Sequence, residues 1–237
     1  MYDQLAAQRH RRFIKTHTPL DGLPSKPDVC YLVVARHPLD MAVSLYHQGD
    51  NIDRERLRRL TGAPEPSAPE PSAPEPSAPE PSSPAPARPP LHAWLMRWID
   101  RDSDPRTELD SLPGVLWHLT DAWRRRREPH VRLVHYDDLL ADLAGQMRGI
   151  AAWLGIDVPA RRWPALVEAA TFAAMRRRAP LLVPDTAGVL KDHLSFFRQG
   201  RSGSGRDPLT AEEIGRYHRR AAALAPPDLL AWLHRGR

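Results

Sequence analysis

Two side chains that suit a phosphate ligand follow an apolar run near the start of the sequence. Arg36 comes directly after this run, residues 29–35, and Ser44 lies eight residues further along. Guanidinium and hydroxyl groups both donate hydrogen bonds to phosphate oxygens, and the guanidinium adds a positive charge. The pattern indicates an anion site, although an arginine paired with a carboxylate and a serine facing solvent would fit the same spacing.

Lys15 and His17 form a second candidate group, in a stretch that is predicted to be a short strand, residues 12–17. Alternate residues of a strand point the same way, so both side chains would leave one face. An imidazole accepts a proton near neutral pH, and an ammonium group stabilises negative charge. A lone histidine near a strand end is usually a surface or hydrogen-bonded core residue, but the nearby Lys15 and Arg36 favour a functional role.

A loop rich in glycine and arginine lies in the C-terminal third of the chain, at residues 198–206. Its backbone N–H groups and its three arginine side chains, Arg198, Arg201 and Arg206, can surround an anion. A flexible loop exposed to solvent explains the same composition equally well. The sequence therefore leaves both interpretations of this loop open.

Two predicted strands must position these side chains. Residues 29–35 are apolar without alternation and too few for a typical helix, which predicts a strand buried on both faces in a parallel sheet, with Cys30 inside it. Residues 131–136 predict another strand, which ends at Tyr136. Open α/β sheets bind ligands at the carboxyl ends of their strands, so Arg36 and Tyr136 should face one crevice.

Helices are predicted between and after these strands, several of them with one apolar face. One begins at Pro38, which fits a first helical turn, and another begins at a capping box formed by Thr210 and Glu213. The other predicted helical stretches are residues 51–60, 91–99, 113–127, 137–154, 159–175 and 227–233. The expected fold class is α/β, with a mostly parallel sheet covered by helices.

A proline-rich segment interrupts the helical part of the chain. The unit Ala63-Pro64-Glu65-Pro66-Ser67 repeats through Ser82, and further prolines follow up to residue 90. Alternate prolines donate no backbone hydrogen bonds and have a fixed φ, so the segment is predicted to be extended and solvated. We interpret residues 63–90 as an insertion in a surface loop of a single domain, residues 1–237, since loop-closure entropy grows slowly with length. A proline-rich docking motif is the alternative.

The composition limits the partners of the protein. The 237 residues carry a net charge of +5, which permits an anionic ligand. The arginines at residues 124–127 suit a solvated helix end better than a nucleic-acid contact, so no nucleic-acid partner is expected. No run is long and apolar enough to span a membrane, no signal-peptide pattern is present, and Cys30 is the single cysteine. We therefore expect a cytoplasmic protein without stable membrane insertion.

Five stretches match the motifs of one known family in the family's own order. They are Phe13-Ile14-Lys15-Thr16-His17, Val33-Val34-Ala35-Arg36-His37-Pro38-Leu39-Asp40-Met41-Ala42-Val43-Ser44, His135-Tyr136-Asp137-Asp138-Leu139, Ala170-Thr171-Phe172-Ala173-Ala174-Met175 and Phe197-Arg198-Gln199-Gly200. Together they resemble the cytosolic-type sulfotransferases, which transfer a sulfuryl group from 3′-phosphoadenosine 5′-phosphosulfate (PAPS) to a hydroxyl or amine. The resemblance extends from about residue 12 to the C-terminus, apart from the proline-rich segment.

The resemblance assigns several residues to the 3′-phosphate of the nucleotide. It implies that Arg36 and Ser44 hold this phosphate and that Arg198, Gln199 and Gly200 close over it. The family usually has lysine at the position of Gln199, so this sequence carries one positive charge fewer there.

The resemblance also implies an adenine site and a catalytic pair. Tyr136 and Thr171 would border the adenine, and Phe172 would stack on it. His17 would be the general base, and Lys15 would stabilise charge on the transferring sulfuryl oxygens. PAPS would be the co-substrate, no metal is implied, and the acceptor would be a small molecule or a lipid.

The match with the family is incomplete near the N-terminus. The family begins with a strand and a P-loop-like turn of Lys-Ser-Gly-Thr-Thr-Trp type that binds the 5′-phosphosulfate, and this sequence has no such segment. The expected fold is therefore a P-loop-like sulfotransferase fold without its first strand and loop. The resemblance implies a PAPS-dependent sulfotransferase with His17 as general base. The alternative is a truncated or degenerate family member that binds a 3′-phosphoadenosine nucleotide without turnover.

Overall fold

The computed structural model describes residues 11–62, 88–183 and 185–235 of the chain. Within these residues the sheet consists of two parallel strands, β1 (Tyr31–Ala35) and β2 (Val131–His135). Tyr31 pairs with Val131 and Ala35 pairs with His135, so both strands end at the same edge of the sheet. The predicted parallel arrangement is confirmed, and the residues that follow the two strands start from neighbouring positions.

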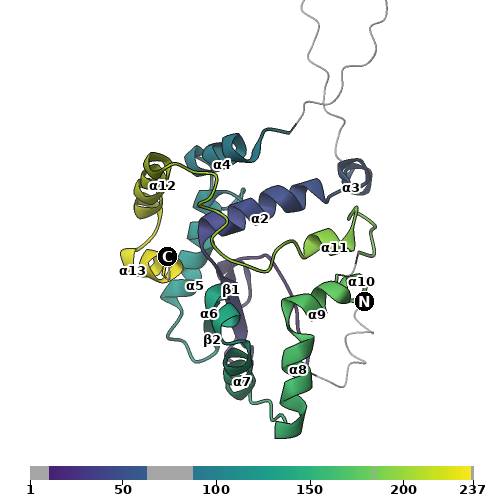
Figure 1. Ribbon diagram of the computed structural model, residues 1–237. Coiled ribbons are helices and arrows are strands. Elements are labelled where there is room, and N and C mark those ends of the chain that lie inside the picture. Colours follow the sequence, from purple (N-terminus) through teal and green to yellow (C-terminus); the bar gives the residue numbers. More distant parts are fainter. Residues whose placement is uncertain (1–10, 63–87, 184, 236–237) are drawn as a thin grey trace, which may run out of the picture.

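Apart from the two strands, the regular structure of the described residues is helical, as expected for an α/β fold (Figure 1). Thr210 and Glu213 form the predicted capping box at the start of α12. In chain order the helices of the described residues are η1 (Leu20–Gly22), α2 (Pro38–Asp50), α3 (Arg54–Thr61), α4 (Leu91–Asp100), α5 (Leu112–Arg124), α6 (Tyr136–Ala141), α7 (Leu143–Trp153), η2 (Ala160–Arg162), α8 (Trp163–Ala169), α9 (Phe172–Arg177), α10 (Ala179–Leu182), α11 (His193–Phe196), α12 (Ala211–Leu224) and α13 (Pro227–Leu233).

The hydrophobic core lies where α2, α4, α5, α12 and α13 pack together and against the sheet. Leu39, Leu116 and Tyr217 are completely buried in it. Figure 1 shows α12 and α13 (yellow) on the opposite side of the strands from α8 to α11 (green). The end of β1 and the start of α2 lie between these two groups of helices.

Among residues 11–62, 88–183 and 185–235, β1 is covered on one face only, which corrects the prediction that it is buried on both. Val33 and Ala35 are buried, whereas Leu32 and Val34 are 42% and 54% exposed. Successive side chains of a strand point to opposite faces, so alternate residues of this apolar run meet the core and the outside. Cys30 precedes the strand and is exposed, not buried as predicted. A continuous apolar run does not reveal which faces have a neighbour.

Two long predicted helices are each divided by a polar residue that caps a new helix. The stretch 137–154 is split into α6 and α7 at Asp142, whose carboxylate accepts a hydrogen bond from the backbone N–H of Gly145 (2.8 Å). The stretch 159–175 is likewise split before α9, where the Thr171 hydroxyl accepts from the N–H of Ala174 (3.2 Å). Aspartate and threonine satisfy the free amides at a helix start, so each one ends the helix before it and begins the next.

Residues 12–17 do not form the predicted strand. They lie in an irregular, exposed segment, in which the Phe13 and Ile14 side chains are 72% and 82% exposed. A strand is stable when its backbone pairs with a neighbour, and within the described residues β1 pairs only with β2. Lys15 and His17 are therefore not displayed together on one strand face.

The chain is anchored to α2 where the proline-rich segment ends. Residues 63–87, which hold most of the predicted insertion, lie outside the described residues. Arg88 pairs with the carboxylate of Asp50 and stacks on Tyr46, with 3.7 Å from its guanidinium carbon to the ring centroid. The Tyr46 hydroxyl donates a hydrogen bond to the carbonyl oxygen of Pro89 (3.0 Å). These contacts fix the chain just before α4.

Candidate functional site

Arg36 lies at the shared edge of the two strands and contacts three other parts of the chain. Its guanidinium carbon lies 4.8 Å from the ring centroid of Tyr136, the first residue after β2. Nη2 lies 3.5 Å from the Asp40 carboxylate and donates a hydrogen bond to the carbonyl oxygen of Arg201 (3.3 Å). Its Nε is buried and has no hydrogen-bond partner within the described residues. The expected proximity of Arg36 and Tyr136 is confirmed.

Asp40 fixes the glycine-rich loop to the start of α2. Its side chain is buried, and its two oxygens accept hydrogen bonds from the backbone N–H groups of Gly203 (2.8 Å) and Gly205 (2.7 Å). Gly205 approaches α2 so closely that a Cβ there would lie 2.4 Å from the carbonyl carbon of Leu39. The Ser202 hydroxyl adds a hydrogen bond to Asp137, just after β2. The loop is therefore held at residues 201 to 205, not loose in solvent.

Three guanidinium groups gather at this edge of the sheet. Burial lowers the pKa of Arg198 below its ordinary value, and the positive charges of Arg36 and Arg201 lower it further. The Asp40 carboxylate opposes this shift. Like charges held near one another attract a multiply charged anion, because its binding relieves their repulsion.

Ser44 lies on the side of α2 that faces the arginines. It follows Asp40 by one helical turn and precedes His47 by one, so the three share a face of the helix. Burial lowers the pKa of His47, and the charge of Arg198 contributes to that shift. Ser44 is exposed, and its hydroxyl makes no hydrogen bond to other described residues. Its position between Asp40 and His47 leaves that hydroxyl available to a ligand near Arg198.

Gly200 and Phe172 are in direct contact. Gly200 has φ +62°, and a Cβ there would lie only 2.4 Å from the ring of Phe172. The Phe197 ring packs edge-on against Phe172, with 6.1 Å between the centroids. Only glycine combines this φ with such a close approach, so the start of the loop rests on α9.

Thr171 and Gln199 each already make a side-chain hydrogen bond within the protein. The Thr171 hydroxyl caps α9 and donates to the carbonyl oxygen of Glu168 (2.9 Å), so it borders the region without a free donor. Gln199 is exposed, and its Oε1 accepts a hydrogen bond from Nε of Arg201 (3.3 Å). The side chains predicted to surround a nucleotide are thus near one another, but these two already have partners.

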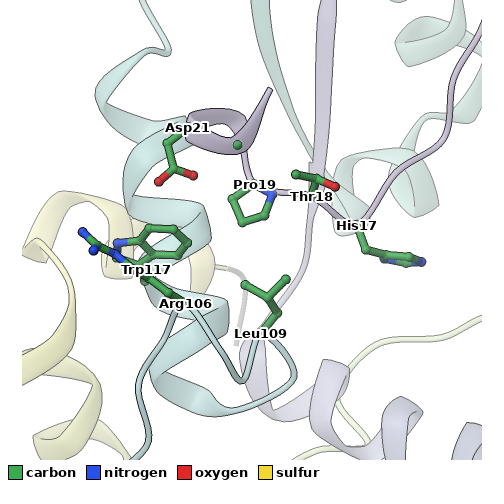
Figure 2. A pocket seen from close by; sticks show the side chains of 8 residues that line it. His17, Thr18, Pro19, Asp21, Arg106, Leu109 and Trp117 are labelled. Atoms are coloured by element: carbon green, nitrogen blue, oxygen red, sulfur yellow. The ribbon is translucent and has the colours of Figure 1, made fainter. Parts of the chain in front are cut away.

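His17 lies apart from the arginines, at the edge of a cleft of about 470 Å³. Figure 2 shows its side chain pointing away from Asp21 and Trp117 on the opposite side of this cleft. The cleft is lined by His17, Thr18, Pro19, Asp21, Gly22, Arg106, Leu109 and Trp117. In the described part of the chain, no hydrogen bond, ion pair or ring contact joins His17 to the arginines. Lys15 lies elsewhere in the same segment, with Nζ 5.9 Å from the ring centroid of Phe196.

A half-buried histidine cluster lies beside the start of α2 and was not recognised in the sequence. His37 caps α2, since its Nδ1 accepts from the N–H of Leu39 (3.2 Å), and its ring lies 4.8 Å from that of His234. The Tyr217 hydroxyl and His234 Nε2 are 2.8 Å apart. Burial lowers the pKa of His37 to about 3 and that of His234 to about 4.

Arg206 belongs to this histidine cluster and not to the group of arginines around Arg36. Its Nη2 lies 3.5 Å from Nε2 of His218, which stacks against His234. Of the three arginines predicted to surround an anion, the structure brings two, Arg198 and Arg201, to the edge of the sheet. Asp40 was also missed in the sequence, although its spacing of one helical turn from Arg36 could have indicated it.

Neither a metal site nor a membrane span is found among the described residues. No group of three or more histidine, cysteine, aspartate or glutamate side chains there is arranged to hold a metal ion. None of the described helices has the length and apolar character required to cross a bilayer.

Sequence comparison relates the chain to proteins of one family. The family profile described as "Sulfotransferase domain" matches residues 1–225. Glycolipid sulfotransferases of Mycobacterium bovis (strain BCG / Pasteur 1173P2) and Mycobacterium tuberculosis (strain ATCC 25618 / H37Rv) are each 40% identical to this chain over 242 residues. Each alignment covers 98% of this chain and 72% of the relative.

Structure comparison finds the same fold in two proteins solved with a nucleotide. Mouse sulfotransferase SULT7A1 complexed with PAP matches with a TM-score of 0.69 and 18% identity, over 98% of this chain and 72% of that one. Retinol dehydratase in complex with androsterone and the inactive cofactor PAP matches with a TM-score of 0.63 and 23% identity, over 95% and 59%. These identities support the fold alone.

Proposed function

The chain belongs to the sulfotransferase family of enzymes, and from this premise we propose that it transfers a sulfuryl group from PAPS to a hydroxyl group of a glycolipid. The proposed acceptor follows the names of the relatives that are 40% identical to it. The proposed donor follows the PAP bound in the structural neighbours, since PAP (3′-phosphoadenosine 5′-phosphate) is what remains of PAPS after transfer.

The electrostatic proximity of Arg198 to Arg36, with Ser44 one helical turn after the Asp40 that pairs with Arg36, is the observation that carries this proposal. Under it, the two guanidinium groups and the Ser44 hydroxyl bind the 3′-phosphate, while Gln199 and Gly200 close over it. Arg36 comes from the edge of the sheet and Arg198 from a loop 162 residues later in the chain. A dianionic phosphate accepts several charge-assisted hydrogen bonds at once, and this arrangement supplies them from two directions.

The adenine would lie beside the side chains that are proposed to bind the 3′-phosphate. We place it against Phe172, with Tyr136 and Thr171 along its border. Phe172 contacts Gly200 on one side, so it would stack on the base with the other. Because the Thr171 hydroxyl caps α9, this residue would contribute contact and not a hydrogen bond.

In the proposed reaction His17 removes the proton from the acceptor hydroxyl. The acceptor oxygen then forms a bond to sulfur, while the bond between sulfur and the bridging phosphate oxygen breaks and PAP leaves. Lys15 would stabilise the charge on the sulfuryl oxygens. A loose transition state of this kind depends mainly on positioning and on positive charge around the transferring group.

The cleft beside His17 suits an amphipathic acceptor, and the His17 imidazole, which points away from it in Figure 2, would have to turn toward it to act as the base. Pro19, Leu109 and Trp117 offer apolar surface, while Asp21 and Arg106 offer hydrogen-bonding groups. Its volume of about 470 Å³ lies within the usual range for small-molecule sites. A sugar head group could thus meet the polar side chains while the first part of a lipid chain covers the tryptophan.

A transfer assay with radiolabelled PAPS and a panel of glycolipids tests the proposal. We expect label in the lipid fraction and a loss of at least ~100-fold for His17→Ala, the usual effect of removing a general base. His92→Ala removes a histidine on α4, outside the cleft and the arginine group, and is the matched control. Failure of the chain to bind PAP in calorimetry, together with no transfer, would reject the proposal.

The second candidate function is binding of a 3′-phosphoadenosine nucleotide without turnover. It is favoured by the exposed position of Lys15 and His17, whose segment is not part of the sheet among the described residues. It predicts that PAP binds, that no label is transferred, and that His17→Ala has the same affinity for PAP as the wild type.

A further inference from the structure

We propose that Arg201 is a third cationic ligand of the nucleotide 3′-phosphate and supplies the charge that is absent at Gln199. This inference rests on the proposed function, because it assumes that the arginine group binds that phosphate. It concerns a residue outside the motif stretches that match the family. Three features of the molecule support this role: the fixed backbone of the loop, the side-chain partner of Arg201 and the balance of charge around it.

The backbone of Arg201 is fixed beside Arg36. Its carbonyl oxygen accepts a hydrogen bond from the Arg36 guanidinium (3.3 Å). On its C-terminal side the Ser202 hydroxyl is bonded to Asp137, and the N–H of Gly203 is bonded to Asp40. A side chain attached to backbone held in this way starts within reach of whatever ligand Arg36 contacts.

The side chain of Arg201 has one polar partner, which leaves its charge uncompensated. Nε donates to Oε1 of Gln199 (3.3 Å), a contact that orients the guanidinium without neutralising it. Within the described residues Arg201 forms no ion pair with a carboxylate. Its terminal nitrogens therefore remain available for a phosphate, and Gln199 acts as a positioning residue.

The charges around the site are best balanced when Arg201 takes part. Arg36, Arg198 and Arg201 lie close enough to affect one another, and Asp40 is the buried carboxylate among them. A phosphate dianion and one carboxylate together match three guanidinium groups. Arg206, the other arginine of the loop, is turned toward the histidine cluster and does not enter this balance.

The role of Arg201 predicts a loss of affinity that depends on the 3′-phosphate. Calorimetry on the full chain would compare PAP with adenosine 5′-monophosphate, which lacks that phosphate. Arg201→Met should weaken PAP binding about 10-fold, the usual scale for one charge-assisted contact, and change adenosine 5′-monophosphate binding less than ~2-fold. Arg127→Met removes the same charge from an exposed arginine three residues after α5, away from the loop, and should change neither affinity.

A rescue experiment separates charge from loop structure. In the double variant Gln199→Lys, Arg201→Met the lysine should restore most of the lost PAP affinity, because it returns a cation to the position where the family usually has one. Thermal unfolding of Arg201→Met should match that of the wild type, since the side chain is exposed. A weakened Arg201→Met that the lysine does not rescue would overturn the proposal, because the effect would then come from the loop.

PAP affinities of the Arg36 and Arg201 variants distinguish an error in the role of Arg201 from an error in the nucleotide site itself. If Arg36→Met loses PAP binding while Arg201→Met binds as tightly as the wild type, the role of Arg201 is wrong and the proposed function stands. If the wild-type chain does not bind PAP, or if Arg36→Met leaves its affinity unchanged, the nucleotide site itself is wrong and Arg201 has no role in it.

Discussion

At the scale of single residues, Asp40 connects the end of β1 and the start of α2 to the glycine-rich loop. It is 2% exposed and joins Arg36, Gly203 and Gly205 through three different donors. A buried carboxylate is stable only when its oxygens are paired, and here the pairing also fixes the loop that carries Arg198. The residue that shapes the anion site is thus itself an anion.

Asp40→Asn should destabilise the fold by about 2–4 kcal/mol. The amide keeps the shape of the side chain, but one oxygen acceptor becomes a donor that faces a backbone N–H, and the Arg36 ion pair is lost. Urea unfolding followed by circular dichroism measures the change. Asp50→Asn, on the same helix, breaks only the pairing with Arg88. The Asp50 side chain is 55% exposed, so this loss should cost less than about 1 kcal/mol. Equal losses in both variants would contradict the structural role of Asp40.

The residues of this site could be predicted in part from the sequence. Arg36 and Tyr136 follow apolar runs, and the rule that parallel strands end at one edge brought them together correctly. Asp40 was overlooked because an aspartate in the first turn of a helix is an ordinary capping choice. The turn of Arg206 toward His218 depends on the packing of α12, which no local pattern reveals.

At the scale of elements, the close contact between the loop and α2 requires a glycine. Gly205 lies against the backbone of Leu39 and Asp40, and a Cβ there would be 2.6 Å from the Asp40 nitrogen. The constraint comes from proximity, because both neighbours are backbone atoms that cannot move without displacing the start of α2.

Gly205→Ala should therefore destabilise the protein, by about 1–3 kcal/mol, and loosen the loop. Gly215→Ala is the contrasting variant, since Gly215 lies within α12 and a Cβ there meets nothing nearer than 3.5 Å. It should stabilise the protein by about 0.5–1 kcal/mol through helix propensity alone. Thermal denaturation of the two variants should give midpoints on opposite sides of the wild type, and a shift of both in one direction would argue against the contact.

The elements themselves were predicted better than their boundaries. The capping box at Thr210 and the helices α4, α5 and α13 are confirmed, because capping residues and apolar periodicity act locally. Residues 12–17 do not form the expected strand, and no other described residues cover the second face of β1, because both features depend on which neighbours the sheet has. Sheet partners are a long-range property that alternation along one strand does not encode.

At the scale of the whole molecule, the histidine cluster joins the first strand–helix unit to the C-terminal helices. His37 caps α2, and His234 follows α13. The rings of His37 and His234 are in direct contact, and Tyr217 and His218 of α12 pack against them, with Arg206 and Asp40 as the charged groups that face His37. Partial burial and neighbouring positive charge lower the pKa of His37, His218 and His234.

The stability of the protein should fall in mild acid. The folded-state pKa of His37 is about 3 and that of His234 about 4, both below the ordinary value of 6.5, so the unfolded chain binds more protons below pH 6.5. The contribution of these two histidines to the free energy of unfolding is complete above pH 6.5. It is lost as the pH falls toward 4, at up to about 1.4 kcal/mol per pH unit for each histidine. Urea unfolding between pH 7.5 and about 5 tests this sign.

His37→Asn isolates the part that His37 plays in this pH dependence. Asparagine can accept the Leu39 amide hydrogen bond but does not titrate, so the cap is kept while the pH dependence becomes shallower. A variant with the same slope as the wild type would show that other groups cause the loss in acid.

The contacts of Arg88 with α2 have a consequence for how the length of the preceding proline-rich segment can vary. Arg88 contacts Asp50 and Tyr46 before α4 begins, so both ends of the proline-rich segment are attached to the fold. Each doubling of the length of that segment therefore costs only about 0.6 kcal/mol in loop-closure entropy. Variants with more or fewer repeat units should therefore differ little in their free energy of unfolding.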